Sequence, residues 1–191
     1  MDDTRTPLHT RTIRLDGFGR PDGGVDVEAR LTDVKHYELL NWPRGPLPAG
    51  QPQHDMVMTM TVGPDFTIRA FEARTEASPH PVCPEGAARF SRLVGLSISR
   101  GFTRQAAERI GGVEGCTHIR EVLQQMATVA FQSMRESRLR GYADQPQTRP
   151  PQIDTCIAWS SAGEWVRVRF PAFYTGPEGR APGGAAGGAP Q

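Results

Sequence analysis

The chain has 191 residues, enough for one domain with a core that needs no disulfide staples. Its 22 Lys and Arg residues nearly balance 21 Asp and Glu residues, which excludes a global attraction to nucleic acid or to an anionic membrane. The chain has no apolar run of membrane-spanning length, no signal-peptide core, and three widely spaced cysteines, so we expect a cytoplasmic protein with free thiols.

The composition predicts three segments. Residues 1–10 form a flexible N-terminus, and residues 11–175 form a single domain. Residues 176–191 are rich in Gly, Pro and Ala and cannot bury enough apolar surface to fold, so they form a disordered tail.

The first half of the domain has the two-residue periodicity of half-buried strands. A first strand passes through residues 13–15, and the alternation over 25–31 continues to Asp33, placing this carboxylate on the apolar face, where it needs a partner. A third strand is expected over 36–40. Residues 56–62 and 66–73 form a hairpin, with Met56, Met58 and Met60 on one face as core residues.

The sequence predicts that the second half of the domain is mainly helical. Helices are expected from Pro84, over 102–110, and from Thr117, where apolar residues recur at i, i+3, i+4 and i+7 for several turns. Residues 153–159 and 165–170 are predicted to form a closing hairpin, with Cys156 in the core. The fold class is therefore α+β, an antiparallel sheet with helices packed on one face.

Thiols and imidazoles collect at the predicted ends of these elements. Cys83 and Cys116 each stand at a helix start, where free amide groups and the helix dipole stabilise a thiolate. Cys116 and His118 form either a metal-ligand pair or a thiol–base pair. The alternative is that the cysteines are simply buried, because buried cysteine is common and usually inert.

His54 and Asp55 open the methionine strand, and neighbouring strand residues point to opposite faces. The alternation places Met56 inward and Asp55 outward. We nevertheless favour Asp55 as the inward residue, which requires an irregular strand start, and assign His54 to a supporting position around the site.

Residues 11–174 resemble a family of uncharacterised bacterial proteins known only as a domain of unknown function. The resemblance is carried by short motifs in a fixed order, and it implies no activity. These motifs are Arg11-Thr12-Ile13, Asp22-Gly23, Asp26-Val27-Glu28, Leu31-Thr32-Asp33-Val34-Lys35, His54-Asp55-Met56, Cys83, Leu93-Val94-Gly95-Leu96, Gly101-Phe102, Gly111-Gly112 and Gly115-Cys116-Thr117-His118.

A looser resemblance, over residues 54–131, is to the U-type iron–sulfur cluster scaffold proteins. It implies a scaffold-like core in which Asp55 matches the acid of that family's site, and Cys83 and Cys116 match its second and last cysteines. Gln53 stands where the family has its first cysteine and Gly115 where it has a histidine, which His118 would replace. These departures favour a zinc ion over an iron–sulfur cluster.

The sequence thus predicts a zinc site made by Asp55, Cys83, Cys116 and His118, with His54 and Asp33 supporting the ligands. One alternative is a metal-free lyase or hydrolase of aromatic or acyl catabolism that uses Cys116 or His118. Another is a non-catalytic module that binds a small molecule or a protein. Whether the protein is an enzyme stays open, and its methionine face and strand edges are compatible with a homodimer.

Overall fold

The computed structural model describes residues 5–41, 44–134 and 148–177, which belong to two compact units. The first unit covers Met1–Glu136 and the second covers Ser137–Gln191. Most of the predicted tail, residues 178–191, lies outside the described residues, as do residues 1–4 of the predicted N-terminal segment.

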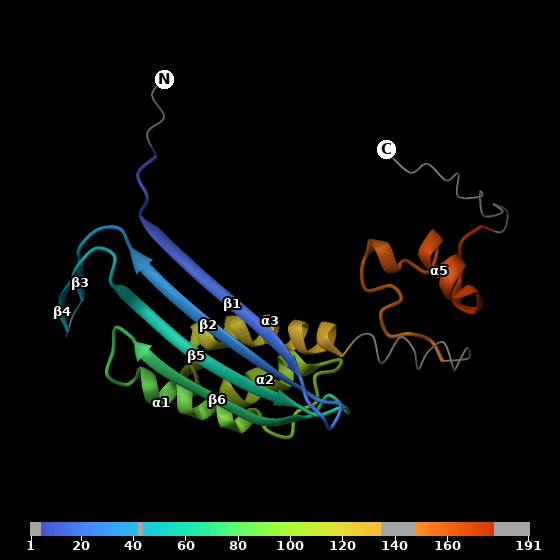
Figure 1. The fold of residues 1–191 in the computed structure, drawn as a ribbon, viewed down its shortest axis with the longest axis horizontal. Helices are drawn as coiled ribbons and strands as arrows, with labels where there is room; N and C mark the ends of the chain where they lie inside the picture. Colours follow the sequence, from blue (N-terminus) through green and yellow to red (C-terminus); the bar gives the residue numbers. More distant parts are fainter. Residues whose placement is uncertain (1–4, 42–43, 135–147, 178–191) are drawn as a thin grey trace. The chain divides into compact units, whose positions relative to one another are not determined.

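The first unit is built on a four-stranded antiparallel sheet in the order β1-β2-β5-β6 (Figure 1). Its strands are β1 (His9–Gly19), β2 (Val25–Lys35), β5 (Pro52–Val62) and β6 (Ile68–Ala77). The third strand predicted at 36–40 is reduced to β3 (Leu39–Asn41), which pairs with β4 (Gly45–Leu47) in a separate two-stranded ribbon. The β5–β6 hairpin is confirmed.

Helices cover one face of this sheet, which confirms the α+β class (Figure 1). They are α1 (Cys83–Ala88), the 3₁₀ helix η1 (Arg89–Leu93), α2 (Phe102–Ile110), the 3₁₀ helix η2 (Gly112–Glu114) and α3 (Thr117–Ser133). The apolar stripe of α3 packs against β1, β2 and β5. The strand methionines Met56, Met58 and Met60 are fully buried beneath the helices, as predicted for core residues.

An irregularity in strand pairing lies just before His54, near the start of β5. Asp33 pairs with His54, but the next residue of β2, Val34, pairs with Pro52, so Gln53 is an extra residue in β5. From His54 onward the alternation is regular, with His54 and Met56 on the helix-covered side. Asp55 therefore lies on the opposite face, and the inward position that we favoured for it from sequence is occupied by His54.

The prediction of a closing hairpin over 153–170 is wrong. The second unit contains the 3₁₀ helix η3 (Ile157–Trp159), α5 (Glu164–Arg169) and the 3₁₀ helix η4 (Pro171–Phe173). The turn at Asp154, which has a positive φ of 66°, and the Glu164–Arg167 ion pair along α5 favour these short helices. Cys156 is exposed, so its assignment to the core is also wrong.

In the part of the chain that the structure describes, every helix is too short or too polar to span a lipid bilayer.

Candidate functional site

The site is organised around a buried carboxylate, Asp33, near the end of β2. Only 1% of its side chain is exposed. Arg11 on β1 binds it with both arms of the guanidinium, through Nε–Oδ1 at 2.8 Å and Nη2–Oδ2 at 2.9 Å. His9 Nε2 lies 3.1 Å from Oδ1. The predicted requirement for a partner at Asp33 is thus met by the neighbouring strand.

Arg11 also reaches across the site to α3, where its Nη1 donates to Glu121 Oε2 at 2.7 Å. It therefore ties β1, β2 and the first turns of α3 together. Burial alone would raise the pKa of Asp33, but the hydrogen bonds and charge of Arg11, with the His54 and His9 imidazoles, lower it to about 2. Asp33 is consequently ionised at neutral pH.

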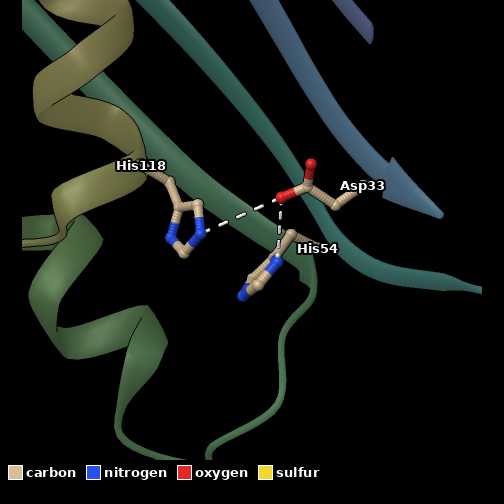
Figure 2. A group of neighbouring side chains, drawn as sticks. All are labelled: Asp33, His54 and His118. Atoms are coloured by element: carbon tan, nitrogen blue, oxygen red, sulfur yellow. Dashed lines mark hydrogen bonds and ion pairs between the residues drawn. The ribbon is translucent and has the colours of Figure 1, made fainter. Parts of the chain in front are cut away.

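Two histidines face this carboxylate from different elements (Figure 2). His54 Nδ1 on β5 lies 3.1 Å from Asp33 Oδ2, and His118 Nε2 on α3 lies 3.9 Å from the same oxygen. Their ring centroids are 4.0 Å apart. The ring nitrogen of His54 that does not face Asp33 points away from the carboxylate (Figure 2).

Both imidazoles are held in the neutral form. Burial, reinforced by the adjacent His118 ring, lowers the pKa of His54 to about 4 despite the charge of Asp33. Burial and the positive charge of Arg11 lower the pKa of His118. Neutral imidazole nitrogens with free lone pairs are the form in which histidine binds metal ions.

Asp33, His54 and His118 form a compact group of possible metal ligands. One ligand atom of each lies within 4.8 Å of those of the other two. Ligand atoms that share a tetrahedral zinc ion are roughly 3.3 Å apart for bonds of about 2.0 Å. The distances of 3.1 and 3.9 Å to Asp33 Oδ2 bracket that separation.

The two cysteines predicted at helix starts lie beside this group. Cys83 is the first residue of α1, and Cys116 is the N-cap of α3, with its Sγ 3.8 Å from His118 Nδ1. Both cysteines, His54 and His118 line one cavity of about 390 Å³. The structure therefore brings together four of the residues singled out from sequence.

Asp55 is not part of this group. On the face of the sheet away from α3 it accepts two hydrogen bonds from Arg30, Nε–Oδ1 at 2.8 Å and Nη2–Oδ2 at 2.6 Å. The ion pair gives Asp55 a structural partner of its own.

Sequence reasoning missed Arg11 and His9 as partners of Asp33. A signal was present, because the β1–β2 hairpin turns around Asp22 and residues equidistant from its centre pair with one another. That register places Arg11 directly opposite Asp33. The predicted alternation located the buried acid, and the hairpin centre would have located its counter-ion.

A model of a protein family of unknown function, DUF2889, matches residues 9–132, a range that includes all of the site residues described above. No curated protein and no solved structure matches the chain.

Proposed function

The chain belongs to the DUF2889 family of unknown function, and from the geometry above we propose that it binds one zinc ion through Asp33, His54 and His118. The single observation that carries the proposal is the convergence of three ligand atoms, from β2, β5 and α3, within 4.8 Å. A carboxylate and two neutral imidazoles are a donor set that suits zinc.

The contacts indicate which atoms would bind. Asp33 Oδ2, His54 Nδ1 and His118 Nε2 face one another, whereas His118 Nδ1 lies beside Cys116 Sγ at 3.8 Å. A proton on Nδ1 of His118 would be shared with that sulfur and leave Nε2 unprotonated as the ligand. Arg11 and His9 would hold the carboxylate from behind, as outer partners of metal ligands commonly do.

This ligand set differs from the one predicted from sequence. His118 is retained, and Asp33 and His54 move from supporting positions to ligands. Cys116 becomes a neighbour of His118, Cys83 part of the adjacent cavity wall, and Asp55 has no place in the set. Three protein ligands leave a coordination position for a small molecule, at which a zinc ion would supply Lewis acidity.

We expect the protein purified without chelator to carry close to one equivalent of zinc, measured by elemental analysis. His54→Ala and His118→Ala should each weaken zinc binding by more than about tenfold in competition with a chromophoric chelator. His36→Ala is the matched control, because His36 is exposed and outside the site.

Two results would contradict the proposal. One is less than about a tenth of an equivalent of any transition metal. The other is that Cys116→Ser releases the metal while His54→Ala retains it, which would favour the cysteine-containing ligand set predicted from sequence.

A second candidate function is favoured by the 3.8 Å contact between Cys116 Sγ and His118 Nδ1 at the cavity. In a metal-free enzyme, His118 would accept the thiol proton and Cys116 would act as nucleophile. Iodoacetamide should then alkylate Cys116 faster than the exposed Cys156, and His118→Gln should slow the reaction about tenfold. Alkylation of Cys116 no faster than Cys156, or unaffected by His118→Gln, excludes this candidate.

A further inference from the structure

We propose that the cavity beside Asp33, His54 and His118 binds a small organic carboxylate with an apolar body. The carboxylate would lie against the first turn of α3 and His54, and the apolar body would lie at the cavity mouth. This inference names a ligand class for the proposed zinc site and rests on that proposal for the protonation of His54.

The cavity has the size and position of a ligand site. Its volume of about 390 Å³ falls within the range of small-molecule pockets, roughly 300–1,000 Å³. Its walls come from the start of β5, from α1 with the loop before it, and from the start of α3. Two of the three proposed zinc ligands, His54 and His118, form part of the wall, so a bound molecule would reach the metal.

One donor to an anion is His54. Its side chain is nine-tenths buried, and Nδ1 faces Asp33. The other ring nitrogen, Nε2, has no hydrogen-bond partner among the described residues, although His54 lines the cavity. If Nδ1 binds zinc, a neutral imidazole carries its proton on Nε2, which then donates into the cavity.

The start of α3 supplies further donors. Cys116 is the N-cap, and no side chain caps the helix. The first amide with an acceptor in the helix geometry is that of Arg120, bonded to Cys116 O at 3.0 Å, which leaves the amides of Thr117, His118 and Ile119 without an intrahelical acceptor. Such amides and the positive end of a helix dipole bind carboxylates well.

The charged side chains around the cavity do not oppose an anion. Glu85 and Arg89, four residues apart in the lining, have side chains of opposite charge that offset each other. Arg89 and Arg92 both bind one carboxylate, Glu114, at 3.2 and 2.8 Å, so together with Glu85 the charges of this corner of the cavity cancel. The cavity would therefore attract a carboxylate through individual hydrogen-bond donors and not through a large net positive charge.

The apolar part of the ligand is indicated by the cavity mouth. Val82, the N-cap of α1, and Val113 of η2 both line the cavity, yet they are 61% and 92% exposed. Pro79 adds a third apolar side chain. Single exposed valines are ordinary, but two that flank the same cavity offer a surface that a ligand's hydrocarbon part would cover.

The test is calorimetric titration of the zinc-loaded full chain with hexanoate and with its neutral analogue hexanamide. Hexanoate should bind at least about tenfold more tightly than hexanamide. Val113→Asp places a carboxylate at the mouth and should weaken hexanoate binding about tenfold, with little effect on folding because the side chain is exposed. Val168→Asp, at an exposed valine of α5, is the control and should leave binding unchanged.

Zinc content is measured in the same samples, so the two proposals fail separately. Equal binding of hexanoate and hexanamide, or no binding of either by zinc-loaded protein at about 10 mM ligand, overturns the carboxylate assignment and leaves the zinc proposal standing. Hexanoate selectivity in protein that takes up no zinc overturns the zinc proposal and with it the donor role of His54, because Nε2 carries the proton only when Nδ1 binds zinc.

Discussion

Replacing Arg11 by Met should lower the free energy of unfolding at pH 7 by about 3 kcal/mol. Asp33 would then be a buried carboxylate without its guanidinium partner, in contact with the imidazoles of His54 and His9. This loss of unfolding free energy is at the lower end of the range for a broken buried ion pair, because the Arg11 side chain is one-third exposed. Urea unfolding in the presence of a chelator measures the loss in the metal-free protein.

The matched control is Arg14→Met, three residues along the same strand. Arg14 binds Asp16 with a similar Nε–Oδ2 distance of 2.8 Å, but both side chains are exposed, so its unfolding midpoint should stay at the wild-type value. Loss of stability in Arg11→Met should shrink as the pH falls toward 4, because Asp33 without Arg11 takes up a proton more readily. Equal midpoints for the two variants would show that Arg11 does not neutralise Asp33.

The metal-free protein should lose about 3 kcal/mol of stability between pH 6.5 and pH 4 because of His54. In the unfolded chain this histidine takes up a proton near pH 6.5, whereas burial and His118 lower its pKa in the folded protein to about 4. Protons therefore favour the unfolded state throughout this window. His118, with its pKa lowered by burial and Arg11, adds a loss of the same sign.

Asp33 has the opposite shift and acts in a different pH range. Its pKa of about 2 lies below the ordinary value of 3.8, so its stabilising effect is complete above pH 3.8 and disappears only as the pH falls toward 2. In chelator-treated protein, His54→Asn should remove about half or more of the slope between pH 6.5 and 4, and His36→Asn should keep it. An unchanged slope in His54→Asn would mean that His54 is not held neutral by the fold.

Local periodicity was sufficient to predict most of the first unit. The alternation that buries Val25 to Leu31 also buries Asp33, and the stripe that starts at Ile119 became the longest helix. The same reasoning failed at 153–170, where the segments 153–159 and 165–170 are so short that their mixed pattern fits a strand or a helix equally well. There the choice depends on contacts that a hydrophobic period does not contain, such as the hydrogen bond that the Ser161 backbone N–H donates to Asp154 Oδ1.

The sequence predicted several of the residues at the site, but it did not predict how they are arranged. Cys83, Cys116 and His118 surround one cavity, as their positions at helix starts suggested. The inward position of His54 follows from the regular alternation of β5, which also places Asp55 outward. An inward Asp55 would have needed an irregularity after His54, whereas the extra residue Gln53 comes before it. Only the long-range pairing of Asp33 with His54 identifies the acid that faces the histidines.

The three proposed ligands are contributed by β2, β5 and α3, and their positions in the chain are far apart. An unfolded chain therefore offers no preformed chelate, and the ligands meet only after α3 has docked on the sheet. Binding of an ion by these ligands is coupled to the folding equilibrium, because the binding free energy is gained only in the native state. Metal availability in the cell would then set how much of this protein is folded, as well as how much of it is loaded.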